Sequence, residues 1–125
     1  MADRLAPELA RLVGEATLVL GPLGIGDHVD HLIVREALEQ VADRKRFLYW
    51  EDWPYLDRAP DSRGAPDWAV SLDAELRETR VAMCGAYESQ LGFQFGGRLR
   101  MEERLAAIEE ERFIAPTAPA LPKAR

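Results

Sequence analysis

The order of the segments between residues 16 and 50 constrains the fold of this chain more than any other feature. Residues 16–20 (Ala-Thr-Leu-Val-Leu) are β-prone, residues 21–26 contain three glycines and a proline, and residues 28–42 follow a helical pattern. The aromatic run over residues 46–50 predicts a second strand. Strand, helix and strand in this order form a parallel βαβ unit with a right-handed crossover. The predicted fold class is therefore α/β with a parallel sheet.

The glycines of residues 21–26 allow the backbone to approach a ligand closely. The loop is not a P-loop, because no Gly-Lys-Ser/Thr follows it, and the G-x-G-x-x-G spacing of dinucleotide sites is also missing. A small nucleotide-binding domain therefore stays open as an alternative that the glycines alone support.

Both histidines of the chain lie in the tetrad His28-Val29-Asp30-His31, where the predicted helix begins. Three residues apart on a helix, His28 and His31 are surface neighbours, and Asp30 between them is able to orient or polarise an imidazole. His31 lies one turn ahead of Val34, the first residue of the apolar stripe of this helix. We therefore expect the His31 ring to face the interior at the carboxyl end of the first predicted strand. Ligands of open α/β sheets bind at this end of the strands.

A structural interpretation of the tetrad stands beside the functional one. Histidines near a helix start are commonly solvated or hydrogen-bonded, and an H-x-D-H spacing by itself is a weak metal signal. The acidic pair Glu51 and Asp52 directly follows the second predicted strand, so these side chains are expected to border the same cleft if the two strands are parallel. The aromatic residues around this pair (Tyr49, Trp50, Trp53 and Tyr55) are expected to anchor core and loop, with sugar stacking as the alternative.

Composition limits the class of partner. The chain has 125 residues and a net charge of −6, and its one short basic run is residues 44–46, which argues against nucleic acid or an anionic membrane as the main partner. No apolar run approaches the roughly 20 residues that span a bilayer, and the N-terminus has no signal-peptide layout. The single cysteine, Cys84, fits a reducing, cytoplasmic location and is interpreted as a packing residue.

The remaining pattern predicts these further elements: a helix over 4–13, a long loop over 51–67, a short strand over 68–70, a long helix after it, and a last helix over 98–112. The long helix is expected to bury one face formed by Leu72, Leu76, Thr79, Met83, Tyr87 and Gln90, and the last helix to bury Met101, Leu105 and Ile108. Residues 1–114 are expected to form one domain, and the proline-containing residues 115–125 a disordered tail.

So few strands make a poor sheet by themselves, because parallel sheets are normally covered on both faces. We therefore expect the chain to be an incomplete part of a Rossmann-like, three-layer αβα domain. An uncovered strand edge or apolar face should then favour self-association or binding of a complementing chain.

Four stretches, residues 21–37, 48–55, 87–91 and 111–113, resemble the PIG-L (LmbE-like) family of zinc-dependent N-deacetylases, specifically its C-terminal half. The first contains the H-x-D-H tetrad, and the second reads Leu-Tyr-Trp-Glu-Asp-Trp-Pro-Tyr. The resemblance implies a Rossmann-like fold and hydrolysis of acetyl groups from N-acetylglucosamine-type substrates. It also implies that His31 is a zinc ligand, that His28 stabilises the oxyanion or protonates the leaving amine, and that Asp30 is the acidic partner of His28.

The family's second motif, His-Pro-Asp-Asp, supplies two further metal ligands and the general base, and it does not occur in these 125 residues. Catalytic zinc normally has three protein ligands and an open position for water. The chain is therefore expected to be a fragment that is inactive alone and active with a complementing N-terminal part. The alternative is a non-catalytic interaction or scaffold module that keeps the family's shape.

Overall fold

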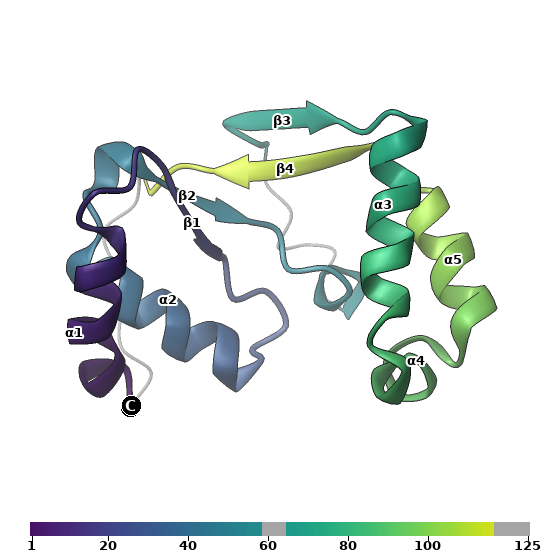
Figure 1. Ribbon diagram of the computed structural model, residues 1–125, viewed down its shortest axis with the longest axis horizontal. Coiled ribbons are helices and arrows are strands. Elements are labelled where there is room, and N and C mark those ends of the chain that lie inside the picture. Colours follow the sequence, from purple (N-terminus) through teal and green to yellow (C-terminus); the bar gives the residue numbers. More distant parts are fainter. Residues whose placement is uncertain (59–64, 117–125) are drawn as a thin grey trace. The chain divides into compact units, whose positions relative to one another are not determined.

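The computed structural model describes residues 1–58 and 65–116 (Figure 1). The chain divides into two compact units, Met1–Trp68 with Arg112–Arg125, and Ala69–Glu111. Each unit is described by itself below. Most of the predicted C-terminal tail, residues 117–125, and part of the predicted long loop, residues 59–64, lie outside the described residues.

The first unit contains the predicted βαβ motif. Helix α1 (Ala2–Val13) precedes strand β1 (Val19–Pro22), helix α2 (Val29–Val41) and strand β2 (Phe47–Trp50), and short 3-10 turns occupy Arg44–Arg46 and Tyr55–Arg58. β1 and β2 are parallel, with Val19 opposite Phe47 and Pro22 opposite Trp50. The predicted α/β class and the parallel pairing are confirmed. The first strand lies later than predicted, because its ladder with β2 extends into Gly21 and Pro22.

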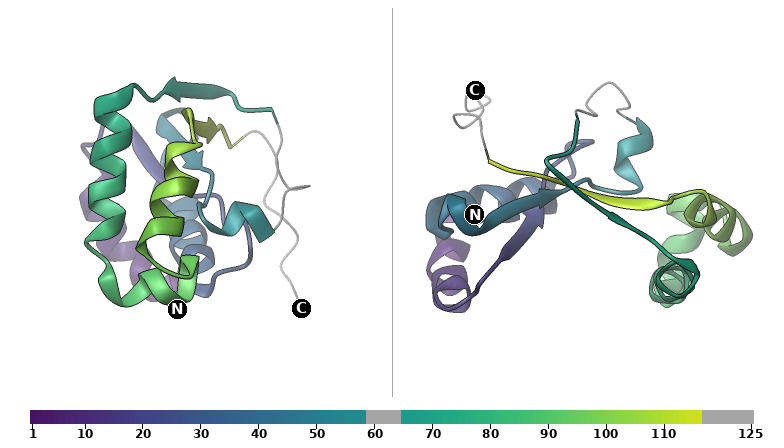
Figure 2. Two further views of the ribbon diagram at one scale, coloured as in Figure 1. Left: turned by 90° about the vertical axis from the view of Figure 1, so that its right-hand side faces the viewer. Right: turned by 90° about the horizontal axis from the view of Figure 1, so that it is seen from above.

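One face of this strand pair carries the core of the unit. Val19, Phe47 and Tyr49 form a buried cluster with Leu38 of α2, and residues from both helices pack against it. The small residues Ala2, Ala6 and Ala37 lie between α1 and α2 and form a second buried cluster, so the two helices lie side by side in both views of Figure 2. The two helices therefore cover the same face of β1 and β2.

The opposite face of β1 is less covered. Side chains alternate across a strand, so Leu18 and Leu20 point away from the buried Val19, and they are 43% and 42% exposed. β1 is also the edge strand of the sheet order β1-β2-β4-β3. An apolar face and a free strand edge thus coincide at β1.

The sheet is mixed, which the sequence pattern did not predict. Strand β4 (Glu110–Ile114) pairs antiparallel with β2, with Trp50 opposite Phe113. The prediction of a helix over residues 98–112 is wrong in its second half, because α5 (Arg98–Ala106) ends early and the next residues pair with other strands. Strand β3 (Trp68–Ser71) confirms the short strand predicted there and is neighbour to β4.

The second unit contains three helices, α3 (Ala74–Gly85), α4 (Glu88–Phe95) and α5. Met101 and Leu105 of α5 are fully buried, as predicted. The predicted single long helix is wrong: it breaks before Glu88, where Tyr87 has a non-helical backbone (φ −89°, ψ 56°). Its predicted buried face is wrong too, because Met83 is 66% exposed and Tyr87 is 70% exposed.

The less exposed side of helix α3 instead carries Arg77, Val81 and Gly85. Gly85 is buried, and Arg98 donates a hydrogen bond to its carbonyl oxygen at 3.0 Å. A Cβ at Gly85 would lie 2.5 Å from the Arg98 guanidinium, so a larger residue there would require the arginine side chain to move. An open groove of about 530 Å³ runs along α3 and α5 within this unit. In the described ranges, no helix has both the length and the apolar character needed to cross a membrane.

Candidate functional site

The carboxyl ends of β1 and β2 bring two distant segments together. Because the strands are parallel and in register, the chain leaves both at the same edge, and the Leu23 N–H donates to the Trp50 carbonyl oxygen at 3.0 Å. The glycine loop and the histidine tetrad follow β1, and Glu51 and Asp52 follow β2. The predicted meeting of these segments at one sheet edge is confirmed.

Asp52 joins the two segments. Its side chain is fully buried, and its Oδ2 accepts a hydrogen bond from the Ile25 N–H at 2.9 Å. Its Oδ1 lies 2.6 Å from Nδ1 of His31. An ionised carboxylate only accepts hydrogen bonds, so we assign the proton to Nδ1 of His31, which leaves its Nε2 with a free lone pair.

This arrangement is the usual support of a metal-bound histidine. Such histidines donate their second ring N–H to a carboxylate or carbonyl, which fixes the tautomer and the orientation of the ring. The side chain of His31 is 28% exposed, so the imidazole is accessible while its carboxylate partner is not. In chemical terms, His31 fits a neutral nitrogen ligand.

His28 lies next to His31 but contributes differently. It is the N-cap residue of α2, with extended backbone (φ −65°, ψ 123°), so it lies just before the first helical turn rather than within it. The two imidazole centroids are 5.2 Å apart. Nδ1 of His28 is buried and has no hydrogen-bond partner among the described residues. A second imidazole nitrogen is therefore held beside His31 with its bonding capacity unused.

The ring of Tyr55 packs against both imidazoles. Its ring centroid lies 5.0 Å from that of His28 and 5.3 Å from that of His31, and the residue is buried. Gly26, with φ +79°, packs directly on it, because a Cβ there would lie 2.8 Å from the Tyr55 Cβ. The glycine thus serves close packing of the loop on the aromatic ring.

The other acidic residues predicted at the site, Asp30 and Glu51, differ in burial. Asp30 is exposed in the first turn of α2 and makes no hydrogen bond or ion pair with another described residue. Glu51 is buried, and its Oε1 lies 3.7 Å from Nη1 of Arg112, itself 11% exposed. Tyr49 and Tyr55 are buried, as expected for anchoring residues. The tetrad therefore does not act as one unit in this structure, since the carboxylate that contacts a histidine is Asp52.

Sequence reasoning placed Asp52 near the cleft but did not identify it as the partner of His31. The available signal was an acidic residue just beyond the second of two parallel strands, at the same level as the histidines. Asp30, the acidic residue between the histidines, is predicted as the partner of His28, but a helix start points successive side chains in different directions, and the carboxylate contact observed is that of Asp52 with His31.

The described part of the chain contains no complete set of metal ligands. Across residues 1–58 and 65–116, no three His, Cys, Asp or Glu side chains are grouped so that they could hold a metal ion. The donor chemistry of His31 fits zinc, but a tetrahedral site with an open position needs two more protein ligands.

No protein-family model matches the sequence, and no curated protein matches it. Several solved structures of deacetylases are similar. An A40926 pseudoaglycone deacetylase is 25% identical with a TM-score of 0.68, and the match covers 94% of this chain and 58% of that one. The zinc-inhibited form of a teicoplanin deacetylase is 22% identical with a TM-score of 0.69, covering 94% and 53%. A deacetylase–bog complex from the teicoplanin biosynthesis pathway is 22% identical with a TM-score of 0.70, covering 94% and 54%.

The chain therefore has the mixed α/β fold of these deacetylases and spans slightly more than half of their length. At this identity the likeness concerns the fold. One of these structures is a zinc-inhibited form of the enzyme.

Proposed function

We propose that this chain carries one part of the active site of a zinc-dependent N-deacetylase of the PIG-L (LmbE-like) kind. The observation that supports this most is the contact of Asp52 with His31 at 2.6 Å, at the carboxyl ends of two parallel strands. The fold shared with A40926 pseudoaglycone and teicoplanin deacetylases supports the same reaction class. From the resemblance to the PIG-L family, we propose an N-acetylated amino sugar of the N-acetylglucosamine type as the substrate.

Each residue has a proposed role in amide hydrolysis. His31 would hold zinc through Nε2, and bound zinc would supply an activated water and polarise the carbonyl. His28 would stabilise the oxyanion or protonate the leaving amine, since it lies beside His31 and has an uncommitted Nδ1. By resemblance, Asp30 in the first turn of α2 would be the acidic partner of His28, although the two side chains share no hydrogen bond in this structure. Tyr55 would pack against both imidazoles.

We infer that the remaining ligands and the general base come from a complementing polypeptide segment. Leu18 and Leu20 on the open face of β1, and its free edge, offer a place for an additional parallel strand. Such a strand would end at the same sheet edge as the histidines. In the absence of this segment, we expect the exposed leucines to cause self-association. We further propose a cytoplasmic location, which a free Cys84 suits.

The test compares zinc binding and hydrolysis by the 125-residue chain with and without a polypeptide that carries His-Pro-Asp-Asp, taken from the part of a similar deacetylase that this chain does not span. We expect weak zinc binding and no hydrolysis of N-acetylglucosamine derivatives by the chain alone, and activity in the mixture. His31→Ala should abolish zinc binding, while His28→Ala should keep the zinc and lose turnover. Robust hydrolysis by the chain alone, abolished by His31→Ala, would overturn the incomplete-site proposal.

A scaffold role without catalysis is the second candidate, favoured by the missing three-ligand group in the described ranges. It predicts that zinc does not bind more tightly in the mixture than to either component and that His31→Ala leaves any binding to the complementing polypeptide unchanged. Sedimentation of the mixture with and without zinc separates the two functions.

A further inference from the structure

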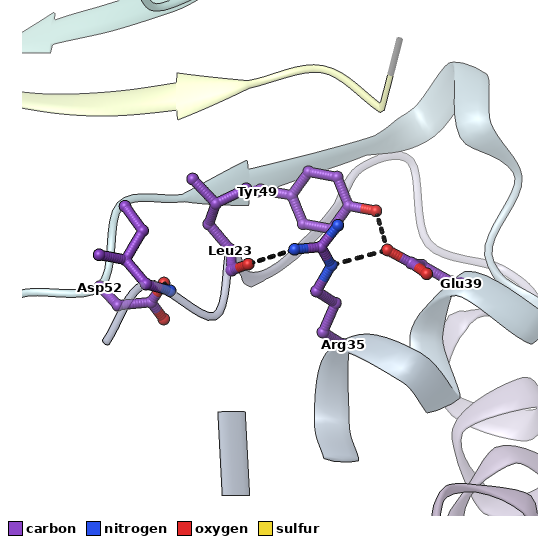
Figure 3. Close-up of polar contacts among 6 residues, drawn as sticks. Leu23, Arg35, Glu39, Tyr49 and Asp52 are labelled. Carbon is purple, nitrogen blue, oxygen red and sulfur yellow. Dashed lines mark hydrogen bonds and ion pairs between the residues drawn. The ribbon is translucent and has the colours of Figure 1, made fainter. Parts of the chain in front are cut away.

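Arg35 lies off the apolar stripe of α2, a position that predicts a surface or ion-pair residue. The ion pair is confirmed by the contact with Glu39, and the side chain is only 18% exposed. Its Nε donates to Oε1 of Glu39 at 2.8 Å, and its Nη1 donates to the carbonyl oxygen of Leu23 at 2.5 Å (Figure 3). The guanidinium also lies over the ring of Tyr49, 4.9 Å from its centroid.

Tyr49 and Glu39 close this network. The Tyr49 hydroxyl donates to the same Glu39 oxygen at 2.6 Å (Figure 3). Burial and the hydrogen bond to Glu39 raise the pKa of Tyr49 to about 12. Burial by itself would raise the pKa of the Glu39 carboxyl, but hydrogen bonds from Tyr49 and Arg35 and the Arg35 charge together lower it. At neutral pH all three groups therefore keep the protonation state that the network needs.

The carbonyl that Arg35 binds belongs to the loop that holds the site. Two residues after Leu23, the Ile25 N–H donates to Asp52, and Asp52 contacts His31. Gly24 between them has φ +84°, a backbone conformation that glycine adopts readily but does not enforce. Contacts with neighbouring residues are therefore needed to hold this segment in one conformation. The Leu23 end of the segment is held through its N–H by Trp50 and through its carbonyl by Arg35, and Asp52 binds the Ile25 end.

We propose that Arg35 is a positioning residue for His31: it holds the Leu23–Ile25 segment so that the Ile25 N–H orients Asp52, and Asp52 in turn holds His31 as the Nδ1–H tautomer. Its catalytic meaning rests on the proposed role of His31 as a metal ligand. The positional effect itself is independent of that role, because it concerns hydrogen bonds that lie entirely within this chain.

The experiment measures the His31 imidazole directly. The full chain is labelled with ¹⁵N at histidine, and long-range ¹H–¹⁵N spectra recorded without metal report which ring nitrogen carries the proton. We expect the wild type to show one Nδ1–H species for His31, and Arg35→Ala to show a mixture of tautomers. His31 is assigned by its loss in His31→Ala.

Arg46 provides a matched control, since its Nη1 also donates to a backbone carbonyl, that of Ala16, at 2.6 Å in the same unit. Arg46→Ala should leave the His31 signature unchanged even where it lowers thermal stability as much as Arg35→Ala. Arg35→Lys serves if Arg35→Ala does not fold: a lysine cannot reach two acceptors as the guanidinium fork does, so it should restore the signature only in part.

The proposal is overturned by an unchanged Nδ1–H species in either folded Arg35 variant, or by an equal disturbance in Arg46→Ala. Zinc affinity of the complemented site is a separate readout. If the His31 tautomer depends on Arg35 but the complemented site binds no zinc, the positioning role is supported and the deacetylase proposal is contradicted. The experiment therefore distinguishes failure of one proposal from failure of the other.

Discussion

Tyr49 makes the stability of the first unit sensitive to alkaline pH. Its hydroxyl is bonded to an ionised carboxylate, and its pKa is raised from 10.0 to about 12. A group whose pKa is higher in the folded state contributes stability that is fully present below its unfolded pKa and is lost as the pH rises through the folded pKa. The contribution of Tyr49 should therefore be complete below pH 10 and should decline between about pH 10 and pH 12.

The magnitude follows from the size of the shift. One pKa unit corresponds to about 1.4 kcal/mol, and at pH 11.5 the linkage relation gives a loss of about 2 kcal/mol for this residue. Solvent screening reduces this contribution little, because Tyr49 is only 5% exposed. Glu39 has the opposite sign: its lowered pKa contributes stability that is present above about pH 4.5 and is lost as the pH falls.

Urea unfolding at pH 8 and at pH 11.5, followed by far-UV circular dichroism, measures this contribution. Tyr49→Phe should destabilise the chain at pH 8 and much less at pH 11.5, because the wild-type hydroxyl has lost most of its contribution at the higher pH. Tyr87→Phe is the matched control: Tyr87 is 70% exposed, and its substitution should leave both values unchanged. An equal cost of Tyr49→Phe at the two pH values would refute the reasoning.

Three further predictions concern the same chain. Asp52→Asn keeps the shape of the side chain but turns one hydrogen-bond acceptor into a donor. It should lower the free energy of unfolding by about 1–3 kcal/mol and move the His31 proton to Nε2, which ring ¹⁵N shifts would report. Retention of the proton on Nδ1 would contradict this. Gly26→Ala should cost about 1–3 kcal/mol because of its positive φ and the contact with Tyr55, whereas Gly92→Ala, with nothing within 4 Å, should not destabilise α4 in thermal melts. Burial raises the pKa of Cys84, so iodoacetamide at pH 8 should alkylate it more slowly in the folded chain than in urea, and equal rates would argue against this.

The part of the fold that could be predicted from the sequence is the part with strong local signals. The β-rich run, the glycines and the helical stripe of residues 16–42 are all local, and their order predicts the parallel pairing. Strand β4 has no such signal: Glu-Glu-Arg-Phe-Ile continues a helical charge pattern, and only pairing with β2 and β3 makes it extended. The pattern of residues 72–90 likewise did not predict the break before Glu88, where Tyr87 is non-helical.

The candidate site divides in the same way. His28 and His31 could be located because they share one loop and one helix start, so their proximity is a local property. The contact of His31 with Asp52 spans 21 positions and exists only because β1 and β2 end at the same edge. The ion pair of Arg35 is consistent with a helix position off the apolar stripe, but its contact with the Leu23 carbonyl has no such local signal, because a long side chain reaches backbone groups of another segment.

The course of the chain through β3 and β4 has an evolutionary consequence. The segment Ala69–Glu111 leaves the first unit on one strand and returns on its neighbour, with Leu72 N–H bonded to the Glu109 carbonyl oxygen at 2.8 Å and Asp67 N–H to that of Phe113 at 3.0 Å. Its two ends are therefore adjacent, as in a domain inserted into a hairpin. Such a segment can be lengthened, exchanged or reduced to a short turn without breaking the βαβ unit that holds the histidines. Changes of length at this position would therefore leave the strand ends beside the histidines unchanged.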